Sequence, residues 1–269
     1  MYVKWQIQIL SKNIIIVVKM DKKIIIANWK MHGTHEFINE FILQMTKFKN
    51  YFNKCDVIIC PPFTLLYKLQ EISKYGMFLG AQDCHFVSDY GAYTGDINAA
   101  MLKSEKCSYI IVGHSERRNY HQENSKLVAE KVTAIHKEGM IAVVCVGESQ
   151  TDRDQGQAYS AVYNQLKESL PPTVHPMNTI IAYEPVWAIG TGIIPSVLDI
   201  MNMHKFIGEK INNNAFEKKY KLIYGGSVKA DNADNILSIN NVDGLLVGGA
   251  SLNAEEFSKI IQNSIKNIE

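Results

Sequence analysis

Eight short runs rich in Ile, Val and Leu recur along the chain, separated by longer segments of mixed polarity. Each run is continuously apolar rather than alternating, which is typical of parallel strands buried on both faces. The eight predicted strands are residues 24–27, 57–60, 77–80, 109–112, 141–146, 180–183, 222–224 and 244–247. Helical spacing of apolar residues predicts helices between them, for example at 125–138, 157–170 and 196–211, and Gly139 should close the first of these.

Eight strand–helix units in about 250 residues predict a closed (β/α)8 barrel, an α/β fold, rather than an open sheet. No shift in composition divides residues 21–269, which therefore form one predicted domain. Residues 1–20 are apolar with scattered lysines, and we expect them to be an N-terminal extension outside the fold. The apolar run at 14–18 is far short of the roughly 20 residues that cross a membrane, and no signal-peptide pattern follows it.

The charge balance and the cysteines exclude several classes of protein. A net charge of +1 gives no overall attraction to nucleic acid, so an anionic ligand must be bound by local groups. The five cysteines are scattered and form no CxxC pair, which argues against a disulfide framework and against a zinc site. We therefore expect buried free thiols in a reducing cytoplasm, and neither a metal nor a membrane partner.

Polar residues follow the first and fourth predicted strands, at the barrel face where function concentrates. Asn28 and Lys30 are two residues apart, so their side chains can point the same way and offer a cation to an anionic substrate. Alternatively, the lysine only packs beside its aromatic neighbour. His114 follows the fourth strand, and Ser115 is the predicted N-cap of a helical turn that begins at Glu116. The positive end of that turn disfavours a protonated imidazole, so a neutral His114 could donate a hydrogen bond.

Glu184 ends the sixth predicted strand and is followed at once by Pro185, which stops the strand from continuing into a helix. A short apolar loop then leads to Gly190 and Gly192, a composition suited to a mobile lid over a general base. The alternative is a solvated glutamate in an ordinary surface turn. The last two strands end in the glycine pairs 225–226 and 248–249, which could present backbone N–H groups to a phosphate.

These segments together closely resemble triosephosphate isomerase, a family with the TIM-barrel fold. The matching segments are residues 27–31, 91–96, 112–118, 145–148, 182–192, 224–228 and 243–251, which run in the family's order from about residue 22 to the C-terminus. The resemblance implies interconversion of dihydroxyacetone phosphate and glyceraldehyde 3-phosphate, a step of glycolysis and gluconeogenesis, without metal or organic cofactor. It also implies a cytoplasmic homodimer in which a loop containing Thr94 docks into the partner subunit.

The resemblance assigns roles residue by residue. Glu184 matches the base that moves a proton between two carbons, His114 the neutral electrophile, and Lys30 the cation that balances negative charge. Further substrate-binding positions are Asn28, Gly190, Ser227, Gly248 and Gly249.

The chain departs from the family pattern at three positions. His32 replaces a usual Asn near the expected dimer interface, Ile193 replaces a usual Lys after the lid, and Asp96 replaces a frequent Glu. Other readings are a phosphate-binding barrel acting on a larger sugar phosphate, a membrane-tethered form using the N-terminal extension, and a catalytically silent barrel that acts as a binding protein. The silent barrel should have lost at least one catalytic residue, and none is lost.

Overall fold

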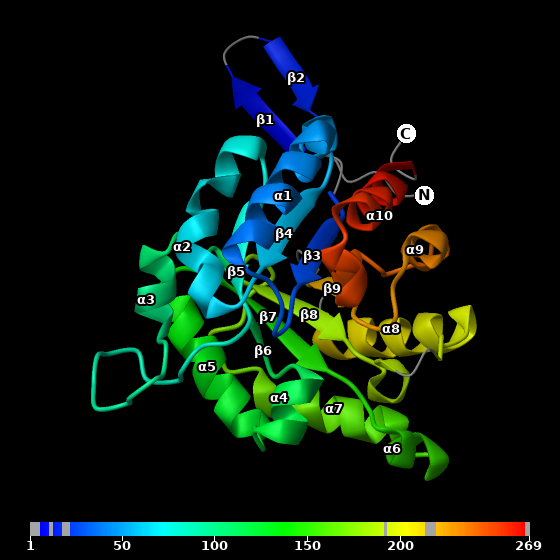
Figure 1. The fold of residues 1–269 in the computed structure, drawn as a ribbon. Helices are drawn as coiled ribbons and strands as arrows, with labels where there is room; N and C mark the ends of the chain where they lie inside the picture. Colours follow the sequence, from blue (N-terminus) through cyan, green and yellow to red (C-terminus); the bar gives the residue numbers. More distant parts are fainter. Residues whose placement is uncertain (1–5, 11–12, 18–21, 191–192, 213–218, 267–269) are drawn as a thin grey trace.

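A computed structural model describes residues 6–10, 13–17, 22–190, 193–212 and 219–266. Eight parallel strands close into a barrel, each paired with the next along the chain and the last with the first (Figure 1). They are β3 (Ile24–Asn28), β4 (Asp56–Cys60), β5 (Phe78–Ala81), β6 (Tyr109–Val112), β7 (Ile141–Val146), β8 (Thr179–Tyr183), β9 (Lys221–Tyr224) and β10 (Gly244–Val247). All eight predicted strands are confirmed, with their ends within one residue.

Helices surround the barrel and connect successive strands (Figure 1). The α-helices are α1 (His35–Met45), α2 (Leu66–Leu69), α3 (Ala99–Ser104), α4 (Ser115–Tyr120), α5 (Ser125–Lys137), α6 (Gln150–Asp154), α7 (Ala158–Ser169), α8 (Val197–Ile211), α9 (Ala230–Leu237) and α10 (Ala254–Lys266). Short 3-10 helices are η1 (Thr46–Tyr51), η2 (Phe63–Leu65), η3 (Gln70–Tyr75), η4 (Val186–Ala188) and η5 (Gly249–Leu252). The predicted helices at 125–138, 157–170 and 196–211 correspond to α5, α7 and α8. Gly139, with φ of 67°, follows the last turn of α5 as expected.

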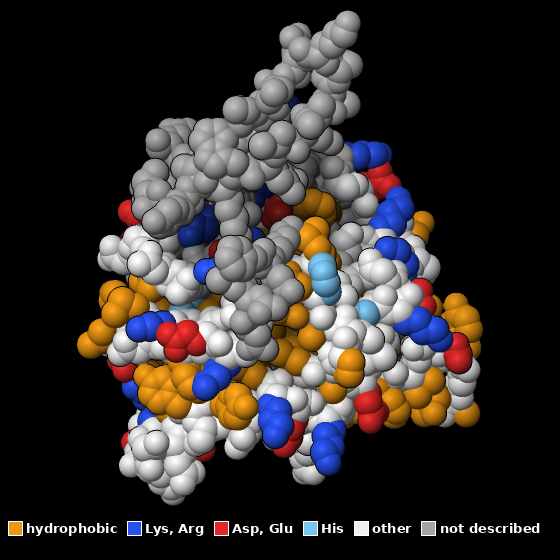
Figure 2. Space-filling model, turned by 180° about the vertical axis from the view of Figure 1, so that it is seen from behind, with side chains coloured by type: hydrophobic (Ala, Val, Ile, Leu, Met, Phe, Trp, Pro, Cys, Tyr) orange, Lys and Arg blue, Asp and Glu red, His pale blue; other side chains and the backbone are white. Residues whose placement is uncertain are grey.

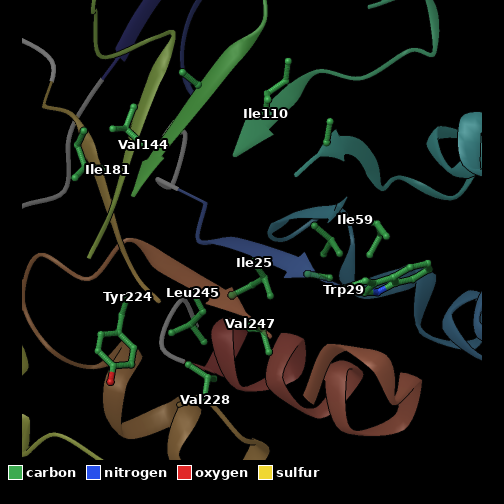
Figure 3. Close-up of a cluster of buried hydrophobic side chains, with 14 of the residues drawn as sticks. Ile25, Trp29, Ile59, Ile110, Val144, Ile181, Tyr224, Val228, Leu245 and Val247 are labelled. Carbon is green, nitrogen blue, oxygen red and sulfur yellow. The ribbon is translucent and has the colours of Figure 1, made fainter. Parts of the chain in front are cut away.

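The strands are buried on both faces, as their continuous apolar runs predict. Alternate residues of each strand belong to two clusters, since successive side chains point to opposite sides. The cluster outside the barrel includes Ile25, Ile59, Ile110, Val144, Ile181 and Leu245 and packs with helix residues (Figure 3). The cluster inside includes Ile26, Ile58, Ile111, Val143, Ile223 and Leu246. Burial of each such side chain stabilises the fold by about 1.5–3 kcal/mol. The two packed layers therefore hold the strands in place, and with them the polar residues that follow the strand ends.

The first residues form a feature that the sequence does not predict. β1 (Gln6–Leu10) and β2 (Asn13–Val17) pair antiparallel in a two-stranded sheet separate from the barrel sheet. The hairpin projects beyond α1 in Figure 1. Within the described residues, no helix is long and apolar enough to span a bilayer.

Candidate active site

Glu184 directly follows β8 and is only 1% exposed. Its backbone N–H donates to the Val146 carbonyl at 2.8 Å, which aligns it with the end of β7. Its Oε2 accepts a hydrogen bond of 3.0 Å from the backbone N–H of Ser115. Its Oε1 is 3.1 Å from His114 Nε2 but is not aligned for a hydrogen bond with it. The carboxylate is therefore enclosed, with one oxygen left to accept a proton.

His114 caps α4, and this corrects the predicted cap. The helix begins at Ser115, one residue earlier than expected, because His114 Nδ1 accepts a hydrogen bond of 3.2 Å from the Glu116 N–H. An accepting Nδ1 carries no proton, so the neutral ring carries its proton on Nε2. That proton is directed toward the same region as the Glu184 carboxylate. The donor role of His114 toward a substrate remains a prediction.

Lys30 lies just beyond β3 with φ of 53°, a left-handed conformation that is uncommon for a non-glycine residue. Asn28 stabilises this turn, because its Oδ1 accepts from the Lys30 N–H at 3.1 Å. Gln82 also bonds to the turn, since its Nε2 donates to the Lys30 carbonyl at 2.9 Å. The Lys30 ammonium lies 2.5 Å from Glu116 Oε1 and so faces α4, which carries the imidazole. The strained backbone therefore directs the cation into the site rather than onto the outer surface.

The glycine-rich loops after β9 and β10 lie at the same end of the barrel. A Cβ built at Gly248 would be 3.3 Å from the Lys30 side chain, so this loop borders the cation, whereas nothing lies within 4 Å of a Cβ at Gly249. Ser227 Oγ donates to the Ala188 carbonyl at 2.8 Å, which ties the β9 loop to the segment after Glu184. Gly190 has φ of 71° and open space around it. Gly192 of the predicted lid lies outside the described residues.

A buried carboxylate beneath the predicted lid was missed at the sequence level. Glu148 is fully buried, and its Oε1 accepts from Trp187 Nε1 at 2.9 Å, Tyr183 OH at 3.0 Å and Arg153 at 3.0 Å. Burial, and then the Glu148 charge, raise the pKa of Tyr183, which therefore remains a donor. Glu148 lies in the Cys145–Glu148 segment, but nothing in that local pattern reveals partners up to 39 residues away.

Glu116 was also missed as a partner. It forms the ion pair with Lys30 across 86 residues of sequence, and only the three-dimensional structure reveals this contact. The structure thus brings together Asn28, Lys30, His114 and Glu184, which sequence reasoning chose, and adds Glu116 between them. Among the described residues, no three His, Cys, Asp or Glu side chains form a potential metal site.

The fold is a (β/α)8 barrel, and its strand ends bring together an acid, an imidazole and an ammonium group. These features define a barrel enzyme of the class that transfers protons on anionic substrates. Residues 23–264 match the family model described as triosephosphate isomerase. The triosephosphate isomerase of Bartonella tribocorum is 45% identical over 238 residues, covering 87% of this chain and 93% of that protein. That of Mesorhizobium japonicum is 41% identical, covering 90% of this chain and 95% of that protein.

The fold comparison agrees with the sequence comparison. The crystal structure of triosephosphate isomerase from Bartonella henselae matches with a TM-score of 0.82 and 40% identity, covering 90% of this chain and 98% of that one. The chain belongs to the triosephosphate isomerase family.

Proposed function

We propose that this chain interconverts dihydroxyacetone phosphate and D-glyceraldehyde 3-phosphate by proton transfer through an enediolate. The observation that carries the proposal is the convergence of Glu184, His114 and Lys30 at one end of the barrel. The conversion needs a base that removes a proton from one carbon and returns it to the next, and groups that stabilise the negative oxygen formed in between.

Glu184 is the proposed base. Its carboxylate is shielded from water, so its basicity toward a carbon acid is not reduced by hydration. The Ser115 N–H bonds to one of its oxygens in the structure, and this bond must lengthen when the carboxylate turns toward substrate. The Glu184 carboxylate therefore exchanges its hydrogen bond with the Ser115 N–H for a contact with the substrate during each catalytic cycle.

His114 and Lys30 are the proposed stabilisers of the developing charge. The Glu116 N–H donates to His114 Nδ1, so the ring proton stays on Nε2. The Nε2–H group can then donate a hydrogen bond to either oxygen of the enediolate. The Lys30 ammonium attracts both the enediolate and the phosphate, and Asn28 supports it through the backbone. Backbone N–H groups at Gly190, Ser227, Gly248 and Gly249 are the proposed phosphate donors.

The segment after Glu184 is the proposed lid. Two hydrogen bonds join η4 to neighbouring segments. Trp187 Nε1 donates to the Glu148 carboxylate, and Ser227 Oγ donates to the Ala188 carbonyl. Both hydrogen bonds link the segment to residues outside it. When the segment closes over a bound phosphate, it therefore exchanges these hydrogen bonds for new ones. Exclusion of water by this movement strengthens the electrostatic effects of the site.

We further propose a cytoplasmic homodimer. The loop at residues 85–98 extends from the barrel and exposes Tyr90 and Tyr93, which suits docking into a second copy. All five cysteines are buried free thiols, which suits a reducing compartment. On the face seen in Figure 2, acidic and basic side chains are interspersed rather than gathered by sign, which supports a small substrate over nucleic acid.

The test is a coupled assay of the purified protein on glyceraldehyde 3-phosphate, without added metal, beside Glu184→Gln. We expect turnover in the wild type and a loss of at least about 10²- to 10⁴-fold in the variant. Glu168→Gln, an exposed change on α7, should retain wild-type turnover. No turnover by a folded wild type would favour the catalytically silent barrel, and turnover insensitive to Glu184→Gln would indicate a contaminating isomerase.

A further inference from the structure

Arg118 is a half-buried cation on α4, four residues after His114, and the roles assigned above do not use it. Its side chain reaches inward between β6 and β7 and donates four hydrogen bonds. Nε donates to the Gly113 carbonyl at 2.7 Å, and NH1 to Ser125 Oγ at 3.1 Å. NH2 donates to the Cys145 carbonyl at 3.1 Å and to Ser169 Oγ at 3.2 Å. The guanidinium thus joins the ends of two strands and two helices.

All four acceptors of Arg118 are neutral. Within the described part of the chain, no carboxylate forms an ion pair with it, in contrast to the adjacent Arg117, whose Nε is 2.6 Å from Glu123 Oε1. Burying a cation without a partner costs free energy, and burial accordingly lowers the pKa of Arg118. An arginine in such a place needs a reason beyond stability, because an apolar side chain would avoid this cost.

The first effect of Arg118 is on backbone position. Gly113 immediately precedes His114 and has φ of 67°, and a Cβ there would be 2.8 Å from Arg118 NH2. Cys145 pairs in register with Ala182, two residues before Glu184. A single planar group therefore sets the distance between the turn that carries the imidazole and the strand beside the base.

The second effect of Arg118 is electrostatic. The attraction between Arg118 and Glu184 is one of the influences that oppose the lowering of the Arg118 pKa, together with Cys145 and Glu123. The other groups facing Glu184 are His114 Nε2 and the Cys145 thiol, and burial raises the pKa of that thiol well above its usual range, which keeps it uncharged. The groups of α5 and α7 that accept hydrogen bonds from the guanidinium are the neutral hydroxyls of Ser125 and Ser169.

We propose that Arg118 is a positioning residue for the isomerisation, because its fork of donors fixes the His114 turn against β7, the strand that pairs with the one leading to Glu184. The proposal rests on the proposed function, since it concerns the efficiency of that reaction. It adds a residue that does not touch the substrate.

The test compares wild type, Arg118→Met and Arg118→Lys for kcat per folded molecule and for KM. In Arg118→Met, kcat per folded molecule should fall about tenfold or more, with KM changed less than about threefold. Arg118→Lys retains the charge but not the fork of donors, so kcat should fall in this variant as well.

The control is Lys23→Met, which removes another cation bound to two carbonyls, at the opposite end of the barrel. It should alter stability and leave kcat unchanged. Should neither Arg118 variant fold, Ser169→Ala removes one acceptor of NH2 and must lower kcat. A wild-type kcat in folded Arg118 variants, or an unchanged kcat in Ser169→Ala when it substitutes for them, would overturn the proposal. Absence of turnover in the wild type would instead refute the proposed function.

Discussion

Glu184 Oε2 lies 3.0 Å from the backbone nitrogen of Ser115, so the proposed base is hydrogen-bonded to the first residue of α4. His114, the cap of that helix, presents Nε2 to the other oxygen of the same carboxylate. The end of β8 and the start of α4 are therefore coupled before any substrate arrives. A substitution that displaces either segment should therefore move both proposed catalytic groups, Glu184 and His114. Substitutions in the surrounding backbone can test the site as well as substitutions of the catalytic side chains.

Gly147→Ala should displace the base without changing any proposed catalytic side chain. A Cβ at position 147 would lie 1.6 Å from the Glu184 carbonyl oxygen, which is backbone and cannot rotate away. We expect a loss of about 1–3 kcal/mol of stability from overpacking, and a fall of about 10²-fold in kcat from the shift of the carboxylate. Urea unfolding and the coupled assay measure the two effects.

The matched control for this substitution is Gly208→Ala within α8. Nothing lies within 4 Å of a Cβ at this position. Alanine should therefore stabilise the protein by about 0.5–1 kcal/mol and leave kcat unchanged. Equal effects of the two substitutions would contradict the close approach of Gly147 to Glu184.

His204 should make stability fall in mild acid. It is fully buried, its Nδ1 lies 3.0 Å from the Asn241 carbonyl, and burial lowers its pKa from 6.5 to about 4. The unfolded chain therefore binds a proton at a higher pH than the folded one. The contribution of neutral His204 to the free energy of unfolding is fully present above about pH 6.5. It is lost as the pH falls toward 4, by roughly 3 kcal/mol in total.

The measurement is the free energy of unfolding in urea at several pH values between 7.5 and 4.5, for wild type and His204→Gln. The variant should be less stable at pH 7.5 but should lose less stability on acidification. His136, whose pKa is also lowered by burial, titrates in both proteins and cancels in the comparison. Parallel stability curves would show that His204 has no such effect.

Trp187 and Glu148 should be energetically coupled. The indole Nε1 donates to the fully buried Oε1 at 2.9 Å, while Arg153 stacks 4.5 Å from the centre of the ring. Trp187→Phe retains an aromatic surface for the arginine but removes the donor. In a double-mutant cycle with Glu148→Gln, we expect a coupling free energy of about 1–3 kcal/mol, since the acceptor is charged. Additive effects on the free energy of unfolding would contradict this bond.

The sequence predicts the barrel better than it predicts the contacts at its mouth. Continuous runs such as Ile141–Val146 report local burial, so all eight strands follow from pattern alone. The pairing of Lys30 with Glu116 and the four bonds of Arg118 join distant segments, and no local periodicity encodes them. The cap of α4 was assigned to Ser115 because its hydroxyl suits that role, but the imidazole of His114 takes it.

The hairpin at the start of the chain should be dispensable for the barrel. The boundary of the barrel lies at Lys23, whose Nζ donates to the Leu237 and Val242 carbonyls at 3.2 and 2.6 Å. Ile24 adds a bond of 3.0 Å from its N–H to the Asp243 carbonyl, and so begins the pairing of β3 with β10. β1 and β2 form a separate sheet that adds no strand to this closure.

A chain that starts at Met20 should therefore retain the wild-type kcat and a thermal midpoint within a few degrees of the wild type, since a surface change away from the core alters stability little. A chain that starts after Ile25 should not fold, because it lacks the lysine and the first two of the five residues of β3, the strand that closes the barrel. Calorimetry and the coupled assay on both chains give the answer. A large loss of stability or turnover in the longer chain would mean that the hairpin contributes to the catalytic domain.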